Sequence, residues 1–271
     1  MSAGETRRSI FITGGASGIG RAVAVFFSER GWFVGIADID AAGMQETLAM
    51  SKAGCCASTH TLDVRDRKQW DVALADFSKA AGGRIDAVFN NAGIGEGGAL
   101  ADQDQDEITR MLDINMKGVI WGAQASHPYL KKTAPGSVLL NTASLAGIIG
   151  SPGLAAYCAT KWAVRGLTES LDAEWAEDGI TVASLCPGFI DTAIIGKVNE
   201  DSNQTAKETL IEQGVEVNPV DIVPEVVWRA VHGEDLHYTV GKMAKRLRFM
   251  QRWLPGRVRK EMRKNGIGVE I

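Results

Sequence analysis

The sequence predicts an open α/β fold, in which a parallel sheet is doubly wound with helices on both faces. Between Ser9 and Leu185, short apolar runs alternate with longer segments whose apolar residues recur at helical spacing. Glycine, aspartate or asparagine follows most of these runs, as in loops at the carboxyl ends of parallel strands, where open sheets bind ligands. The 271 residues contain no linker-like or repeated segment and are 45% hydrophobic, which favours a single large domain.

The first two elements show the pattern that the later ones repeat. Ser9–Thr13 is a short apolar run that breaks into glycines, which indicates a strand. The next segment places Ala22, Val25 and Phe26 at helical spacing and ends before Gly31, a favourable C-cap. The further expected strands are the short apolar or β-branched runs Trp32–Ala37, Ser58–Leu62, Ile85–Phe89, Ser137–Thr142 and Thr181–Leu185. The expected helices, joined to the strands by right-handed crossovers, are Arg21–Arg30, Ala42–Met50, Arg67–Ala81, Ile108–Ser126 and Ala155–Glu177.

The C-terminal part of the chain differs from the rest in charge. The formal net charge is −4, but residues 241–271 contain ten Lys or Arg and two Glu, so they carry about +8 and the rest about −12. We therefore expect a main domain over residues 1–240 and a basic extension over 241–271. Met243, Leu247 and Met250 recur at helical spacing, which predicts an amphipathic helix that either lies weakly on an anionic membrane or packs on this or a neighbouring subunit. The following basic residues are expected to be frayed and solvated: Arg257, Arg259, Lys260, Arg263 and Lys264.

Cysteine use and the N-terminal sequence indicate the compartment. Cys55, Cys56, Cys158 and Cys186 lack the spacing of metal ligands, and the adjacent pair is poorly placed to form a bridge, so all four are expected to be free thiols. A strand predicted from Ser9 leaves no room for a signal peptide, and no apolar run reaches the length of a membrane span. These features predict a soluble, cytoplasmic protein without a metal site, and the negative net charge argues against a nucleic-acid partner.

A glycine-rich segment lies between the first expected strand and helix. Thr13-Gly14-Gly15-Ala16-Ser17-Gly18-Ile19-Gly20 has the spacing Gly-x3-Gly-x-Gly. This departs from the commonest dinucleotide fingerprint, Gly-x-Gly-x-x-Gly, but it stands in the same strand-to-helix context. Glycine permits positive φ and a close approach of the backbone to a ligand, and the N-terminus of a helix attracts a pyrophosphate. The segment therefore predicts a dinucleotide site.

Asp38, at the end of the second expected strand, indicates which dinucleotide binds. A carboxylate 18 residues after Gly20 can accept the ribose hydroxyls of an adenosine and would repel a 2′-phosphate. Neither Ile39 nor Ser17 provides the cation that such a phosphate needs. NAD is therefore expected in preference to NADP, unless Asp38 serves only as an N-cap or turn residue.

A second group of residues can carry acid/base chemistry. Tyr157 and Lys161 are four positions apart, so they project from one face of an expected helix, and Ser144 precedes them in the loop after a strand. A tyrosine with a free pKa of about 10 is a poor base, but an adjacent ammonium and the positive ring of NAD+ would lower that pKa. Tyr157 could then exchange a proton with an alcohol while Ser144 holds the substrate oxygen. Alone, a tyrosine–lysine pair at this spacing usually lies on a helix surface without a function. The prediction of acid/base chemistry rests on its combination with the glycine-rich segment.

In order and spacing, these residues resemble the short-chain dehydrogenase/reductase family. The resemblance covers residues 13–192 and rests on Thr13-Gly14-x3-Gly18-Ile19-Gly20, Asn90-Asn91-Ala92-Gly93, Asn115, Ser144, Tyr157-x3-Lys161 and Pro187-Gly188. It implies a Rossmann-type fold and an NAD-dependent oxidoreductase in which Asn115, Ser144, Tyr157 and Lys161 are catalytic. By the same resemblance, Lys161 also binds the nicotinamide ribose and Asn115 holds a water beside it.

The resemblance also implies a set of cofactor-binding residues. Asp63 and Val64 would contact the adenine, and for Asn90 the ligand role and the structural role are equally open. Thr192 and the backbone of Ile190 would bind the carboxamide of the nicotinamide. The full set is Gly14, Ser17, Gly18, Ile19, Gly20, Asp38, Asp63, Val64, Asn90, Ala92, Gly93, Tyr157, Lys161, Pro187, Gly188, Ile190 and Thr192.

The expected substrate pocket is mainly apolar. Residues 193–219 are expected to form a mobile lid, and Leu145, Ile148, Ile149 and Leu154 an apolar wall, which predicts a hydrophobic secondary alcohol or its ketone as substrate. The resemblance implies a homodimer or homotetramer, built through the helices that bear Asn115 and Tyr157. Two alternatives remain. One is a non-catalytic redox sensor that binds a dinucleotide, and the other is a nucleotide-sugar epimerase or dehydratase, which usually has a longer C-terminal domain.

Overall fold

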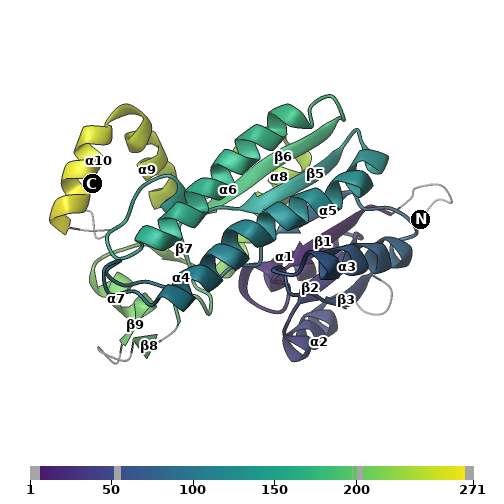
Figure 1. The fold of residues 1–271 in the computed structure, drawn as a ribbon, viewed down its shortest axis with the longest axis horizontal. Helices are drawn as coiled ribbons and strands as arrows, with labels where there is room; N and C mark the ends of the chain where they lie inside the picture. Colours follow the sequence, from purple (N-terminus) through teal and green to yellow (C-terminus); the bar gives the residue numbers. More distant parts are fainter. Residues whose placement is uncertain (1–6, 52–55, 197, 200–203, 266–271) are drawn as a thin grey trace.

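The computed structural model describes residues 7–51, 56–196, 198–199 and 204–265. Its centre is a seven-stranded parallel sheet in the order β11-β6-β5-β4-β1-β2-β3 (Figure 1). The strands are β1 (Ser9–Thr13), β2 (Phe33–Asp38), β3 (Ala57–Thr61), β4 (Ala87–Asn90), β5 (Ser137–Thr142), β6 (Ile180–Pro187) and β11 (His237–Val240). The order reverses between β1 and β4, as in a doubly wound sheet, and this confirms the predicted fold class.

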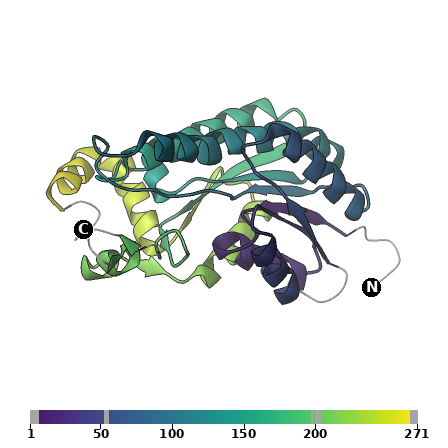
Figure 2. The same ribbon diagram turned by 60° about the horizontal axis from the view of Figure 1, so that its bottom comes forward.

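Helices cover both faces of this sheet. One face carries α1 (Gly18–Glu29), α2 (Ala41–Met50) and α8 (Val223–His232), and the other carries α3 (Arg67–Ala80), α5 (Gly118–Thr133) and α6 (Ala155–Glu174), so the molecule has three layers (Figure 2). Alternate residues of each strand serve the two faces. Ile10 and Ile12 pack beneath α1, whereas Phe11 points the other way and lies 5.2 Å from Phe77, between ring centroids.

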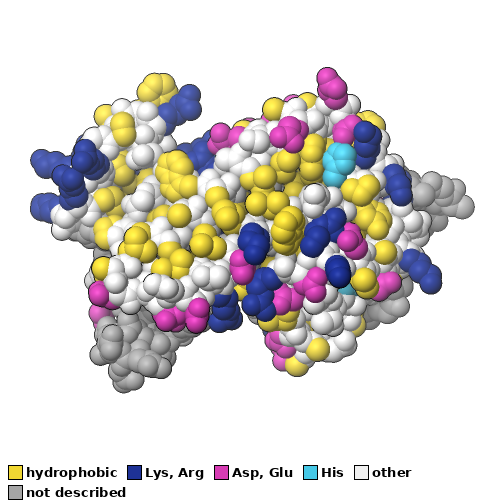
Figure 3. All heavy atoms as spheres, in the orientation of Figure 1, with side chains coloured by type: hydrophobic (Ala, Val, Ile, Leu, Met, Phe, Trp, Pro, Cys, Tyr) yellow, Lys and Arg dark blue, Asp and Glu magenta, His cyan; other side chains and the backbone are white. Residues whose placement is uncertain are grey.

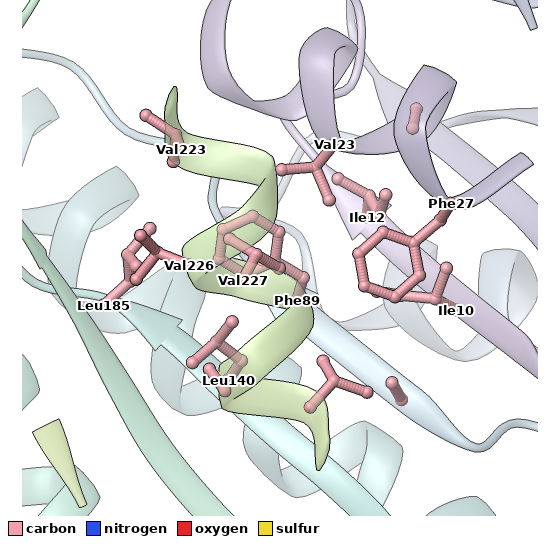
Figure 4. Close-up of a cluster of buried hydrophobic side chains, with 14 of the residues drawn as sticks. Ile10, Ile12, Val23, Phe27, Phe89, Leu140, Leu185, Val223, Val226 and Val227 are labelled. Carbon is pink, nitrogen blue, oxygen red and sulfur yellow. The ribbon is translucent and has the colours of Figure 1, made fainter. Parts of the chain in front are cut away.

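The core beneath α8 shows why this helix belongs to the fold. Val223, Val226 and Val227 recur at helical spacing on its buried face. They contact the cluster that contains Leu140 and Leu185 of the sheet, and this cluster continues to Ile10, Ile12 and Phe27 at α1 (Figure 4). One continuous apolar core therefore joins the first helix to the last strands of the sheet.

The predicted helix Ile108–Ser126 lies within a longer helical segment, which begins at Gln105 and ends at Thr133. The structure has α4 (Gln105–Leu112), a π-helical turn over Asp113–Lys117, and then α5. Asp104 begins α4, since its carboxylate accepts the backbone N–H groups of Asp106 and Glu107. A π turn inserts an extra residue and turns side chains relative to those of a regular helix, which is common near functional sites.

The basic extension forms two helices, α9 (Lys242–Trp253) and α10 (Pro255–Asn265). The expectation that Arg257 to Lys264 are frayed is wrong, because α10 buries Val258 and Met262 in the same cluster as α9. The inner side of α9 packs on its own chain, which is one of the expected arrangements, and contact of its other side with a membrane or a neighbouring subunit stays a prediction. None of the described helices has both the length and the apolar character that crossing a membrane requires.

Short elements make up much of the predicted lid. β7 (Phe189–Ile190) pairs with β10 (Val217–Asn218), β8 (Val198–Asn199) pairs with β9 (Gln204–Thr205), and α7 (Ala206–Glu212) follows. A capping box between Thr205 and Glu208 begins α7. Residues 200–203, the polar middle of the predicted lid, lie outside the described residues, as does Cys55.

Candidate active site

A cavity of about 1010 Å³ lies along the carboxyl ends of the strands, across the point where the strand order reverses. Most of the predicted site residues line it: Gly14, Ser17, Gly18, Ile19, Asp38, Asp63, Val64, Ala92, Gly93, Ser144, Tyr157, Lys161, Pro187, Gly188, Ile190 and Thr192. Gly20, Asn90 and Asn115 are not among its lining residues. Residues far apart in the sequence thus meet at one elongated site, as their places after successive strands predict.

The glycine-rich turn leaves backbone open to the cavity. Gly14 and Gly18 have φ angles of +67° and +51°, which favour glycine. Gly20 serves the turn from outside the cavity, because a Cβ there would lie 2.1 Å from the Gly14 carbonyl oxygen. Ser17 stands at the N-cap of α1 without a capping hydrogen bond from its side chain. The turn therefore offers free donors at a helix N-terminus, which suits a pyrophosphate.

Asp38 contributes a carboxylate to the lining of the cavity. Its carboxylate accepts the backbone N–H groups of Ala16, Ile39 and Asp40 at 3.1, 2.8 and 3.1 Å, so its position is set by the glycine-rich turn and its own loop. Among the described residues, no ion pair involves Asp38. Arg65, which also lines the cavity, pairs with Asp63 at 2.6 Å. The carboxylate is thus held toward the cavity without a neutralising partner.

Two neighbouring asparagines after β4 have different roles. The Nδ2 group of Asn90 donates to Asn141 Oδ1 at 3.0 Å and to the Val119 carbonyl at 3.3 Å. Asn90 is only 2% exposed, so of its two open roles these contacts support the structural one. Asn91, which the predicted site omits, lines the cavity and donates to the Thr13 carbonyl at 3.0 Å. The motif Asn90-Asn91-Ala92-Gly93 contains both residues, but it does not indicate which of them is buried and which lines the cavity.

Asn115 locks the loop after β4 to the π turn. Its Oδ1 accepts the Ile94 N–H at 2.9 Å, and its Nδ2 donates to the Ile94 carbonyl at 2.8 Å. The side chain is fully buried, and the absence of a Cβ at Gly93 keeps both Asn115 and Lys161 close to this loop. These contacts make Asn115 a positioning residue in the described structure, and its link to a water stays a prediction.

Ser144, Tyr157 and Lys161 converge at the middle of the cavity. Tyr157 and Lys161 lie one turn apart on α6, with the Lys161 Nζ atom 5.6 Å from the centroid of the Tyr157 ring. Lys161 Nζ donates to the Thr142 carbonyl at 3.0 Å, and the Ser144 side chain hydrogen-bonds that of Tyr157. The Ser144 hydroxyl also accepts the Ala146 N–H at 3.1 Å, which orients it.

Burial sets the charges of this group without a cofactor. It raises the pKa of Tyr157 to about 12, against the opposing effect of the Ser144 hydrogen bond. It lowers the pKa of Lys161 to about 8. Burial is the largest influence on the pKa of Tyr157, so the expected lowering of that pKa by the Lys161 ammonium together with the positive ring of NAD+ stays a prediction. A further positive charge is needed to favour the phenolate.

Apolar side chains form the wall beside Tyr157. Leu145, Ile149 and Leu154 line the cavity as expected, whereas Ile148 is not among its lining residues. Leu145, Ile148 and Ile149 all belong to the buried cluster that contains α9. The lid contributes Ile194, Ile195, Ala206, Thr209 and Leu210. Glu107 and Arg110 of α4 also line the cavity, and no motif in the sequence indicates them because they are isolated charges on an exposed helix.

Comparisons with known proteins agree with this geometry. The family model described as short chain dehydrogenase matches residues 8–203. SadH of Mycobacterium tuberculosis, named as an oxidoreductase, is 36% identical over 197 residues, which are 72% of this chain and 70% of that protein. LinX of Sphingobium indicum, a 2,5-dichloro-2,5-cyclohexadiene-1,4-diol dehydrogenase, is 33% identical over 233 residues, or 85% and 90% of the two chains. EphD of Mycobacterium tuberculosis, also named as an oxidoreductase, is 34% identical over 202 residues, and this chain spans only 34% of its length.

Solved structures share the architecture. Levodione reductase superposes with a TM-score of 0.77 at 28% identity, covering 86% of this chain and 94% of that chain. A short chain dehydrogenase/reductase from Burkholderia phymatum, solved in complex with NAD, gives a TM-score of 0.81 at 24% identity over 94% and 96% of the two chains, and this likeness concerns the fold. The family match covers well over half of the residues and includes the glycine-rich turn and the Tyr157–Lys161 helix. The chain is a member of the short-chain dehydrogenase family of oxidoreductases.

Proposed function

We propose that the protein is an NAD-dependent oxidoreductase that interconverts a hydrophobic secondary alcohol and its ketone. The observation that carries this proposal is the meeting of Ser144, Tyr157 and Lys161 between the glycine-rich turn and an apolar wall. A redox sensor needs the turn but has no use for an acid/base pair beside a second, apolar compartment. An enzyme needs both.

The residues divide the work along the cavity. The glycine-rich turn would hold the pyrophosphate, Asp38 the adenosine ribose, and the segment with Pro187, Gly188, Ile190 and Thr192 the nicotinamide end. When bound, NAD supplies the acceptor or donor of the hydride. Gly18 lies close to Thr192, since a Cβ at Gly18 would be 3.3 Å from the Thr192 Cγ2 atom. This closeness supports a single ligand that contacts both the glycine-rich turn and the loop with Thr192.

Ser144 and Tyr157 act on the substrate oxygen. Ser144 donates a hydrogen bond to it, and Tyr157 takes the hydroxyl proton during oxidation or returns it during reduction. Lys161, with its lowered pKa of about 8, carries most of its charge at neutral pH and favours the phenolate of Tyr157 once the cationic ring is also present. Because the pKa of Tyr157 is about 12 beforehand, kcat/KM for oxidation should rise with pH.

The apolar wall supports a lipophilic substrate. Leu145, Ile149 and Leu154 offer no hydrogen bonds from their side chains to a sugar, whereas they suit a ring or chain carbinol. LinX, whose name specifies a ring diol as its substrate, adds support for an alicyclic carbinol. The charge of Asp38 supports NAD over NADP, and NAD in turn favours oxidation.

The helices α5 and α6 support assembly into a homodimer or homotetramer. They expose Ile120 and Trp162, at 36% and 46%, on the outer face of the sheet layer. Light scattering of the purified protein tests this, and a monomer at all concentrations would contradict it.

The test of the activity is the appearance of NADH with a panel of aliphatic, aryl and alicyclic secondary alcohols. Tyr157→Phe serves as the control, since it keeps the ring and removes the hydroxyl. Turnover that the variant lacks would support the proposal. Tight NAD binding with no turnover of any alcohol, or of the matching ketones with NADH, would favour the redox sensor. A clear preference for polyols over every apolar alcohol would contradict the substrate class.

A further inference from the structure

We propose that the outer corner between α9 and α10 docks the protein on an anionic lipid surface. The corner consists of Phe249, Trp253 and Leu254, whose exposed fractions are 62%, 63% and 47%. They lie within six residues of the chain, and Phe249 and Trp253 are one helical turn apart, so they share one side of α9. An exposed group of large apolar side chains of this kind marks a contact surface.

Packing among the described residues does not use this side. The inner side of α9 buries Ala244, Leu247 and Met250 against the body, and α10 buries Val258 and Met262 in the same cluster. The helix α9 is therefore apolar on two sides: one is occupied by its own domain, and the other faces solvent.

Exposed cations surround the corner. Residues 242–264 contain ten Lys or Arg and a single Glu, and Figure 3 shows Lys and Arg gathered on the outer part of this lobe. The Arg252 guanidinium lies 5.6 Å from the centroid of the Trp253 ring. A groove of about 310 Å³ on α10 is lined by Gly256, Arg259, Lys260, Arg263 and Lys264. Within the described part of the chain, no ion pair neutralises any of these ten cations.

The combination of aromatic and basic side chains favours lipid over other partners. Trp and Phe settle at the boundary between headgroups and acyl chains, while neighbouring Lys and Arg reach anionic headgroups. A nucleic acid would engage the cations but leave Phe249 and Leu254 in water. A two-fold contact between copies of this chain would place the ten cations of one copy against those of the other, and like charges repel.

The position of the corner connects this surface to the active site. The inner side of α9 belongs to the same buried cluster as Leu145, Ile148 and Ile149, which lie in the segment after Ser144. Docking would thus bring the cavity to the surface where hydrophobic alcohols accumulate, a benefit that rests on the proposed function. The docking itself can be measured without turnover, so the two proposals can fail separately.

The experiment is co-sedimentation of the full chain with vesicles of phosphatidylcholine, alone or in equimolar mixture with phosphatidylglycerol. We expect binding to the anionic vesicles only, weakening as salt is added. Phe249→Ser with Trp253→Ser should weaken partitioning by roughly tenfold or more, since it removes the buried apolar contact. Reversing Lys260 and Arg263 to Glu should weaken it roughly 25-fold per residue, since each reversal removes one positive charge and adds one negative charge.

Val72→Ser is the matched control, because Val72 on α3 is as exposed as Phe249, at 62%. Circular dichroism and NAD affinity of each variant check that the fold is kept. Unchanged vesicle binding by the Phe249/Trp253 variant would overturn the proposal. The proposal would also be overturned if the wild type did not bind vesicles and the Phe249/Trp253 variant changed its oligomeric state. That result would identify the corner as a subunit interface. Tighter binding to single-stranded RNA than to vesicles, insensitive to the apolar substitutions, would identify a nucleic-acid surface instead.

Discussion

At the scale of single residues, the proposed preference for NAD rests on Asp38. Asp38→Asn keeps the size of the side chain and an oxygen for its backbone donors, but removes the charge that would bind two ribose hydroxyls. We expect the KM for NAD to rise about 10- to 100-fold with little change in kcat, since a hydrogen bond to a charged group contributes about 1.5–3 kcal/mol. Steady-state kinetics with NAD and NADP measures this. Asp40→Asn is the matched control, because Asp40 caps α2 and is absent from the cavity lining, and equal KM values for the two variants would refute the assignment.

The buried ammonium of Lys161 makes a second prediction, about stability. Its pKa falls from 10.5 to about 8 in the folded protein. Between these values the unfolded chain binds more protons than the folded one, so the free energy of unfolding of the wild type should rise with pH across this window. At pH 7 both states hold the proton, and the folded state bears the full cost of a buried charge.

Lys161→Met should therefore be more stable than the wild type at neutral pH, by about 1–3 kcal/mol after the lost hydrogen bond to the Thr142 carbonyl is allowed for. The gain should shrink toward pH 10, and turnover should be lost. Urea unfolding at several pH values measures the difference. A gain that stays constant with pH would show that the ammonium is not desolvated in the folded protein.

At the scale of elements, the short 3-10 helix over Leu145–Gly147 sets where Ser144 stands. A Cβ at Gly147 would lie 2.6 Å from the Lys161 carbonyl oxygen, and Arg165 donates to the Gly147 carbonyl at 2.9 Å. The turn is thus pressed onto α6 and held there by a side chain of the same helix. Under the proposed function, Arg165 is thus a positioning residue for this turn.

Gly147→Ala should push Ser144 away from Tyr157 and Lys161 and lower kcat by about 10- to 100-fold, since a misplacement of about 1 Å has effects of that size. NAD affinity should change little, because the glycine-rich turn is not moved. Gly150→Ala is the control in the same loop, since a Cβ there would meet nothing within 4 Å. If both variants retain full kcat, the turn does not position Ser144.

The elements also show what a sequence can predict. The strands β1 to β6 lie within two residues of their expected ranges, because each is a short apolar or β-branched run bounded by turn residues. β11 and α7 give no such signal, since a four-residue strand and a seven-residue helix depend on what they pack against. The expected helix Ile108–Ser126 lies within the observed helical segment, but its apolar spacing does not indicate the π turn over Asp113–Lys117 or the ends at Gln105 and Thr133.

The same distinction holds inside the site. Residues that meet the cavity follow from motifs at the ends of strands, as Asp38 and Ser144 illustrate. The contacts of Asn90 with Asn141 and of Asn115 with Ile94 do not, because those partners are 51 and 21 positions away and no periodicity relates them. Arg165 was likewise absent from the predicted site, since nothing local distinguishes it from other helical arginines.

At the scale of the whole molecule, the C-terminal helices pack in the same buried cluster as part of the apolar wall beside Ser144. Leu247 of α9, 2% exposed, lies in the cluster that also contains Leu145 and Ile149. Leu247→Ala should reduce the free energy of unfolding by about 2–5 kcal/mol and also lower kcat, because the wall beside Ser144 loses its backing. Chemical unfolding and kinetics at a temperature where the variant stays folded measure the two effects.

Leu74→Ala separates these effects. Leu74 on α3 is fully buried in the cluster on the same side of the sheet as α5 and does not line the cavity, so this variant should lose similar stability and keep its kcat. An equal loss of kcat in both variants would mean that general destabilisation, and not the contact with α9, accounts for the effect of Leu247→Ala.

The buried cluster shared by α9 and the segment after Ser144 also has a consequence for the synthesis of the protein on the ribosome. During synthesis, residues 242–265, which form α9 and α10, emerge last. They follow the glycine-rich turn, Ser144, Tyr157 and Lys161. A nascent chain would therefore possess every catalytic group while Leu145, Ile148 and Ile149 still lacked their cover. A premature stop codon or a protease cut just before Lys242 would leave all the proposed catalytic residues in place. We expect such a chain to be inactive and to expose an apolar surface that chaperones recognise.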